Sequence, residues 1–271
     1  MSAAAARSAM RAPARAGSFA VQLSAVSLLV LPLLVVALQA ISRGWFYPDV
    51  LPRDLTFDPA GEVLGRRRTL DAFADGLAIG ALVTVVAFTV GWPAARVLAG
   101  RSLRARGLVF GVLFLPSLLP AVGLAMGVNI VLLHTPLRSS MAGVVVAHLV
   151  PTLPYAVALL TAVLVRADVD QERQAAVLGA SPWQRFRMVT LPAAAGGLAV
   201  AAALVFLVSW SQYLLTLLIG GGEVVTMTML LFSALSGGNP TTIAVLALCA
   251  ALPSIGALAV ASGCLREEDA R

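Results

Sequence analysis

Long apolar segments alternate with short polar ones along this chain. Six segments are each near the roughly 20 residues that a helix needs to cross a bilayer. They comprise residues 19–41, 73–95, 108–132, 140–165, 193–219 and 241–263. The apolar run of the first exceeds the roughly 7–15 residues of a signal-peptide core, so we interpret it as a retained span. The pattern predicts an all-α, polytopic membrane protein with six transmembrane helices within residues 19–263.

Composition supports a membrane protein. Of the 271 residues, 59% are hydrophobic and 12% are charged, whereas about 25% of residues in a soluble domain carry charge. The 19 basic residues are all arginines. A chain without lysine cannot form a P-loop, whose lysine reaches the phosphates of ATP. The formal net charge of +6 is interpreted as a determinant of membrane orientation rather than as a nucleic-acid surface.

The arginines predict the orientation. If the N-terminus is cytoplasmic, thirteen arginines lie inside and six outside, as the positive-inside rule requires. The tails, residues 1–18 and 264–271, are then both cytoplasmic. So is the connection between spans four and five, residues 166–192. The outside arginines are Arg43, Arg53, Arg66, Arg67, Arg68 and Arg138.

Residues 171–192, called the polar loop below, form the longest polar interruption in the C-terminal two thirds of the chain. The run 172–178 favours a helix, and Gly179 suits a helix end. Ser181 and Gln184 predict a capping box, with Pro182 at the first helical position. Two short helices joined at a glycine are therefore expected at the membrane surface. A rigid exposed segment of this kind is expected to bind another protein.

Polar residues at membrane depth are costly in lipid and tend to face a bundle interior or an aqueous cavity. His148 is interpreted as a hydrogen-bonded contact between helices. Gly123 and Gly127 have the small-xxx-small spacing of close helix contacts. Residues 224–235 are expected to form a short helix that either re-enters the membrane or lies on its outer face. The expected translocation path comprises Asn129, Ser209, Trp210, Ser211, Gln212 and Tyr213.

The polar loop resembles the cytoplasmic loop of the inner-membrane permease subunits of binding-protein-dependent ABC importers. The signature of that loop is Glu-Ala-Ala, three residues, Gly, nine residues, Ile, one residue and Leu-Pro. Arg173 and Gln174 stand in place of the signature's Glu and Ala, and Glu172 lies one position earlier. Residues 209–239 also resemble the fifth-span region of permeases for thiamine, polyamines, ferric iron and phosphonates. The signature positions that match are Ala175, Gly179, Val189 (for Ile), Leu191 and Pro192.

This resemblance implies the fold of type I importers such as the methionine importer, in a bacterial inner membrane. It implies that the polar loop contains a coupling helix, which docks in a groove of a separate cytoplasmic ATPase dimer. The chain itself would then not be an enzyme and would hold no cofactor, since ATP and Mg²⁺ bind the ATPase. A second permease subunit and an extracytoplasmic solute-binding protein are the other implied partners. The expected coupling residues are Glu172, Arg173, Ala175, Ala176, Gly179, Ser181, Trp183, Phe186, Leu191 and Pro192.

Two other functions remain open at this point. A secondary transporter would favour carboxylates within the membrane, and the only acid near a span is Asp75. A non-transporting assembly subunit would need no solute path, which the polar cluster 209–213 disfavours. A membrane enzyme is excluded by the absence of His, Asp or Cys at catalytic or metal-binding spacing in the sequence.

Overall fold

The computed structural model describes residues 24, 26–28, 30–46, 48–100, 105–166 and 169–269. Over these residues the chain is helical, and extended segments pair only at the antiparallel bridge between Ser42 and Leu55. An apolar helix, Val26–Ala40, comes first. The helices that follow are α2 (Asp58–Leu64), α3 (Arg67–Ala99), α4 (Arg106–Phe114), η1 (Leu115–Leu118), α5 (Ala121–Leu133), α6 (Met141–Arg166), α7 (Val169–Val177), α8 (Pro182–Arg185), η2 (Phe186–Thr190), α9 (Leu191–Trp210), α10 (Leu214–Gly220), α11 (Met227–Gly237) and α12 (Pro240–Asp269).

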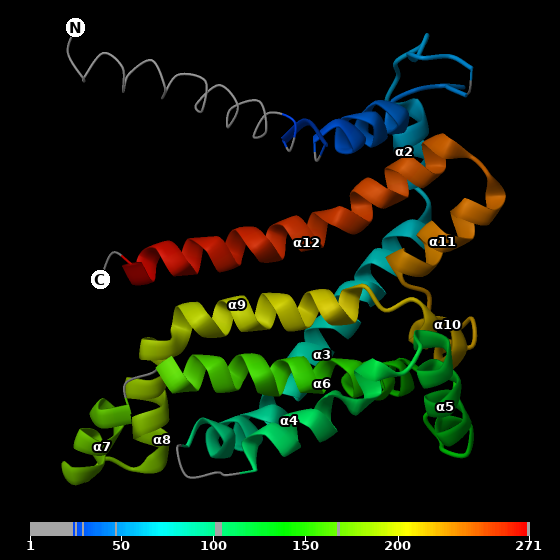
Figure 1. Ribbon diagram of the computed structural model, residues 1–271. Helices are drawn as coiled ribbons and strands as arrows, with labels where there is room; N and C mark the ends of the chain where they lie inside the picture. Colours follow the sequence, from blue (N-terminus) through cyan, green and yellow to red (C-terminus); the bar gives the residue numbers. More distant parts are fainter. Residues whose placement is uncertain are drawn as a thin grey trace, which may run out of the picture.

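Four long helices form the body of the molecule. Helix α3 packs against α6 and α9, α6 packs against α9, and α12 packs against α9 (Figure 1). The described residues contain four helices that are long and apolar enough to cross a membrane: Arg67–Ala99, Met141–Arg166, Pro182–Trp210 and Pro240–Cys264. They correspond to the second, fourth, fifth and sixth predicted segments. Helix Val26–Ala40 lies within the first predicted segment, whose residues 19–23 and the tail 1–18 are outside the described residues.

The third predicted segment is a bent pair rather than one continuous helix. The helical stretches Arg106–Leu118 and Ala121–Leu133 meet at 95°. Pro116 lies in the 3₁₀ turn η1, and Pro120 precedes the first residue of α5. Because proline lacks an N–H and restricts the residue before it, the two prolines end one helix and begin the next. Pro151 and Pro154, in contrast, lie inside the continuous helix α6.

Close helix packing occurs at glycines of α3. A Cβ on Gly76 would lie 2.8 Å from the ring of Trp210, and one on Gly80 would lie 2.6 Å from the ring of Phe206. The absence of side chains at these two positions allows the aromatic rings of α9 to lie on the α3 backbone. The prediction of close contacts at Gly123 and Gly127 is wrong within this chain. Both lie on the exposed face of α5, where a Cβ would meet nothing within 4 Å.

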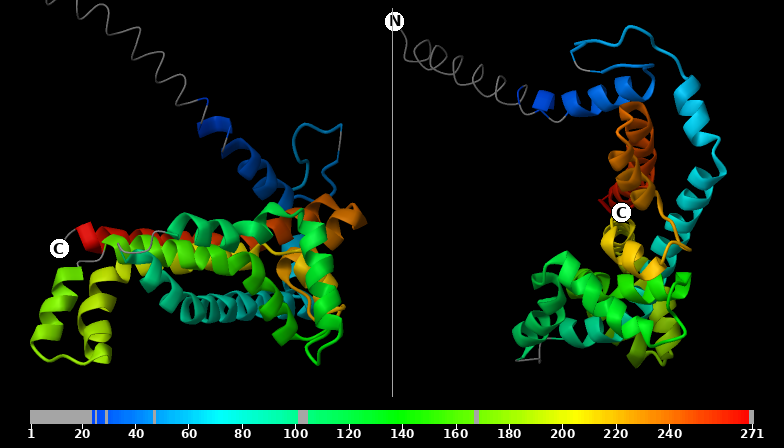
Figure 2. Two further views of the ribbon diagram at one scale, coloured as in Figure 1. Left: turned by 60° about the horizontal axis from the view of Figure 1, so that its bottom comes forward. Right: turned by 90° about the vertical axis from the view of Figure 1, so that its right-hand side faces the viewer.

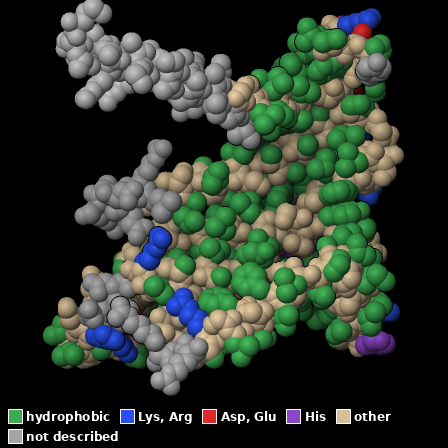
Figure 3. Space-filling view, viewed as in Figure 1, with side chains coloured by type: hydrophobic (Ala, Val, Ile, Leu, Met, Phe, Trp, Pro, Cys, Tyr) green, Lys and Arg blue, Asp and Glu red, His purple; other side chains and the backbone are tan. Residues whose placement is uncertain are grey.

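The two ends of the molecule differ. Helices α7 and α8 lie at the same end as the C-terminal end of α12, whereas α5, α10 and α11 lie at the opposite end (Figures 1 and 2). Hydrophobic side chains are spread over the long helices, and arginines gather toward the ends (Figure 3). This distribution is typical of a protein whose middle lies in lipid.

Candidate functional site

The polar loop is a helix–turn–helix closed by two local motifs. Helix α7 ends in a Schellman motif: the N–H of Ala180 donates to Ala175 O and that of Gly179 to Ala176 O, both at 3.0 Å. Gly179 has φ +88°, the left-handed conformation that this motif requires. The predicted capping box is confirmed, because Ser181 N–H donates to Gln184 Oε1 (2.8 Å) and Gln184 N–H donates to Ser181 Oγ (3.3 Å). The turn between α7 and α8 is therefore fixed on both sides.

The second half of the polar loop is continuous with a long helix. Helix α8 passes through the π-helical turn η2 into α9, and together they form one helix, Pro182–Trp210, of 29 residues. Thr190 is buried, and its hydroxyl donates to Arg185 O at 3.4 Å. Helix α8 and helix α9 therefore have no loop between them.

Two contacts join the polar loop to the end of α3. The Arg96 guanidinium forms an ion pair with Glu172 of α7. One turn earlier in α3, Trp92 packs edge-on against Phe186 of η2, with ring centroids 5.2 Å apart. The side chains of Arg96 and Glu172 are 43% and 20% exposed, so solvent only partly screens the pair. Glu172, which the signature would place one residue later, therefore has a partner within its own chain.

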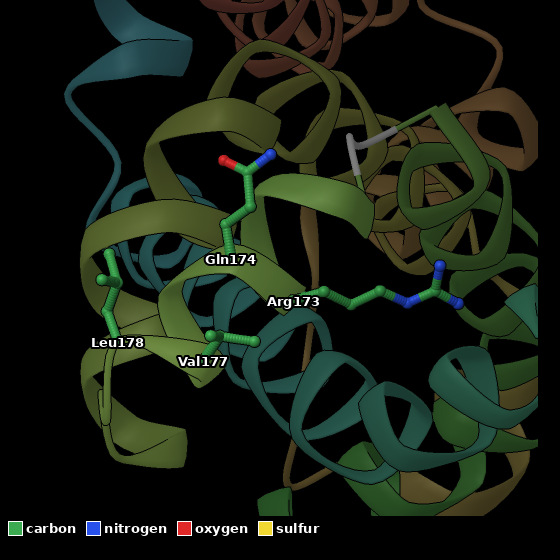
Figure 4. Close-up of a pocket in the computed structure, with 4 residues that line it drawn as sticks. All are labelled: Arg173, Gln174, Val177 and Leu178. Atoms are coloured by element: carbon green, nitrogen blue, oxygen red, sulfur yellow. The ribbon is translucent and has the colours of Figure 1, made fainter.

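The polar loop exposes several apolar side chains among its charged and polar ones. Val177 and Leu178 are each 87% exposed, Met188 is 73% exposed and Trp183 is 65% exposed. An open hollow of about 620 Å³ lies along the C-terminal half of α7. Of the side chains that line it, Arg173 and Val177 extend in one direction and Gln174 and Leu178 in another (Figure 4). Exposed apolar groups of this size beside charged ones are typical of a protein-binding surface.

The structure brings most predicted coupling residues together. Glu172, Arg173, Ala175, Ala176, Gly179, Ser181, Trp183 and Phe186 lie on α7, α8, η2 and the turn between them, and Leu191 and Pro192 begin α9. Sequence reasoning missed Trp92 and Arg96 on α3, and it did not single out the exposed Val177, Leu178 and Met188. The aromatic–arginine pair one turn apart at the end of α3 is the signal that would have found the first two.

Five of the six predicted path residues lie at the break between α9 and α10, and the sixth, Asn129, lies on α5. Ser209 and Trp210 are buried, and Trp210 Nε1 donates to Ala250 O of α12 at 2.9 Å. Tyr213 stacks on Phe232 of α11, with ring centroids 4.2 Å apart. Ser211 is exposed and Gln212 is half-buried, while Asn129 is half-buried on α5, which packs against α10. That these residues line a path stays a prediction.

His148 is confirmed as a contact between helices. It is buried in α6, and its ring nitrogens lie 3.0 Å from Ser209 Oγ and 3.0 Å from Thr216 Oγ1. Among the described residues, His, Cys, Asp and Glu form no group that could hold a metal ion.

Fold and surface together define a polytopic membrane protein with an exposed, partly apolar loop at one end. Residues 87–266 match the family of binding-protein-dependent transport system inner membrane components. This match covers more than half of the chain, and the chain belongs to that family. The resemblance inferred from the polar loop is thereby confirmed.

Individual relatives agree with this assignment. The chain is 30% identical over 168 residues to the trehalose transport system permease protein SugB of Mycobacterium tuberculosis. The aligned residues are 62% of this chain and 61% of SugB. It is 29% identical over 211 residues to the putative 2-aminoethylphosphonate transport system permease protein PhnV of Salmonella typhimurium, covering 77% and 78% of the two chains. A bacterial ABC transporter involved in alginate import has the same fold, with a TM-score of 0.71 and 17% identity over 93% of this chain and 96% of that one.

Proposed function

We propose that this chain is the membrane permease subunit of an ATP-driven importer, and that the polar loop is its contact with a separate ATPase. The observation that carries the proposal is the exposed apolar surface on a loop that is rigidly joined to α3 and α9. Full burial of a Val or Leu side chain contributes about 1.5–3 kcal/mol. Docking of Val177, Leu178 and Trp183 in a groove would therefore offset the entropic cost of association.

The proposed topology has six spans with both termini in the cytoplasm. The four long helices are four of them. The bent pair α4–α5 is counted as one broken span, and the segment that contains Val26–Ala40 is the first. The excess of arginines on the side of the polar loop supports this orientation.

The proposed partners follow from this arrangement. A cytoplasmic ATPase dimer would supply ATP and Mg²⁺ chemistry, and an extracytoplasmic binding protein would deliver the solute. A second permease subunit, either another chain or a second copy of this one, would complete the path. The relatives SugB and PhnV are named for different solutes, trehalose and 2-aminoethylphosphonate. The names of these relatives therefore do not define one solute for this chain.

Purification from the native membrane tests the proposal. Extraction in mild detergent, followed by mass spectrometry, is expected to recover an ATPase with a P-loop and an extracytoplasmic binding protein. Leu178→Asp places a charge on the docking surface and is expected to remove the ATPase. Leu51→Asp is the matched control, because Leu51 is also exposed (70%) but belongs to the loop that precedes α2. Recovery of the ATPase with both variants or with neither would contradict the assignment of the polar loop.

A further inference from the structure

The buried His148 connects the two sides of a broken helix. Helix α9 ends at Trp210 and α10 begins at Leu214. Ser209, in the last turn of α9, and Thr216, in the first turn of α10, each lie 3.0 Å from one nitrogen of the ring. His148 belongs to α6, and it precedes Ser209 by 61 residues and Thr216 by 68 residues in the sequence. We call this arrangement the His148 bridge.

The hydrogen-bond partners determine the direction of each bond. The Thr216 hydroxyl donates its single hydrogen to Gln212 O at 2.9 Å, so it can only accept from the ring. Nε2 of His148 is therefore the donor. In the neutral ring Nδ1 is then the acceptor, and the Ser209 hydroxyl donates to it. A continuous run of donors and acceptors passes from α9 through α6 to α10.

The broken segment has further side-chain support. Thr228 of α11 donates to Trp210 O at 2.9 Å, and Gln212 Nε2 donates to Val208 O at 3.1 Å. Non-helical backbone at membrane depth is tolerated only where such partners are available. Of these contacts, the His148 bridge is the one that touches both helices on either side of the break.

The break lies between two parts of the molecule with different neighbours. Through η2 and α8, helix α9 is continuous with the polar loop at one end of the molecule. Helix α10 packs against α5 at the opposite end (Figure 1). Leu215 and Ile219 of α10 share a buried cluster with Ala125 and Leu132 of α5. The angle at the break therefore decides how a displacement of α9 reaches α5.

We propose that His148 is a positioning residue, and that its bridge fixes the angle between α9 and α10. In the transport cycle it would pass a displacement of α9 to the α5–α10 pair. This second statement rests on the proposed function, whereas the fixed angle does not. Loss of either hydrogen bond leaves the packing of α10 against Val144 and Ala147 of α6 in place but removes the polar contact that fixes its angle to α9.

The angle can be measured with two spin labels on the exposed positions Ala195 (α9) and Leu217 (α10), each changed to cysteine. Cys249 and Cys264 are changed to alanine in this background, and the purified full chain is placed in lipid nanodiscs with any co-purifying partners. A narrow distance distribution is expected for the parent. Ser209→Ala, Thr216→Val and His148→Leu are each expected to lose the narrow distribution. In the His148→Leu background, neither of the other substitutions should broaden it further.

The matched control is Thr161→Val. Thr161 is buried in the same helix α6, but its hydroxyl donates within that helix, to Val157 O at 2.6 Å. This variant should retain the narrow distribution. An unchanged distribution in both Ser209→Ala and Thr216→Val would overturn the proposal, as would equal broadening in Thr161→Val. These two hydroxyl variants serve even if His148→Leu fails to fold.

Uptake and ATP hydrolysis of the assembled complex provide the second readout. Thr216→Val is expected to lower uptake per ATP hydrolysed, since the ATPase remains docked on the polar loop. A merely structural defect would lower both activities together with the amount of protein, and that result would overturn the role in transport. If the distance distribution broadens as expected but no ATP-driven uptake exists in the parent, the proposed function fails and the fixed angle stands.

Discussion

Gly179→Asp is expected to abolish solute uptake while the protein remains in the membrane and its ATPase partner continues to hydrolyse ATP. Gly179 has φ +88°, and a left-handed conformation costs a non-glycine residue about 1–2 kcal/mol. A Cβ at this position would meet nothing within 4 Å, so the effect does not arise from a steric clash within the chain. The aspartate also places a negative charge at the C-terminal end of α7, where the helix dipole disfavours it. The turn between α7 and α8 is expected to change its angle.

Two further variants separate the effect of the charge from other causes. Gly179→Asn has nearly the same shape and the same tolerance of the left-handed conformation as the aspartate variant, but it is neutral, so it should retain more uptake. Gly111→Ala is the neutral control, because Gly111 lies within helix α4 and its Cβ would also meet open space. Uptake and ATP hydrolysis are measured in membrane vesicles and normalised to protein amount. Unimpaired uptake in Gly179→Asp would exclude the polar loop as the coupling element.

Gly80→Val is expected to cause the largest loss of folded protein. Even a Cβ would lie 2.6 Å from the ring of Phe206. This ring belongs to a group of packed aromatic side chains, so it has little room to move away. Phe206 stacks on Trp210, which also packs edge-on against Phe73 and donates its Nε1–H to Ala250 O. Overpacking of a well-packed core typically costs about 1–3 kcal/mol. Thermal unfolding of the detergent-solubilised protein measures this loss.

The control is Gly123→Val, where the added side chain meets open space in this chain. It should leave the unfolding temperature of the isolated chain unchanged. Phe206→Leu should restore part of the stability of Gly80→Val by making room for the valine. Equal stability of the two valine variants would show that α3 and α9 do not pack as described.

The sequence was informative where local chemistry decides the structure. Ser181, Gln184 and Gly179 act on their immediate neighbours, so the capping box and the left-handed turn could be predicted. The long helices followed from the length of their apolar runs. Spacing alone did not show which glycine pair is packed, because Gly76–Gly80 and Gly123–Gly127 have the same pattern. Only the arrangement of α9 against α3 distinguishes them.

Contacts between distant residues could not be predicted. His148 was expected to contact another helix, but Ser209 and Thr216 became its partners only through the crossing of α6 with the broken helix. Likewise, nothing in the polar loop indicates that Glu172 pairs with Arg96, which lies 76 residues earlier. The packing of α3, α6 and α9 against one another determines these pairs, and the hydrophobic pattern of one sequence does not predict that packing.

The most direct test of a coupling role for the polar loop is site-specific photocrosslinking in native membranes. A photoreactive amino acid replaces Leu178, which is 87% exposed at the end of α7, and in a separate variant it replaces Leu51. The account predicts a crosslink from position 178 to a protein with a P-loop, and none from position 51. A crosslink from position 178 only to lipid, or to an extracytoplasmic protein, would contradict it.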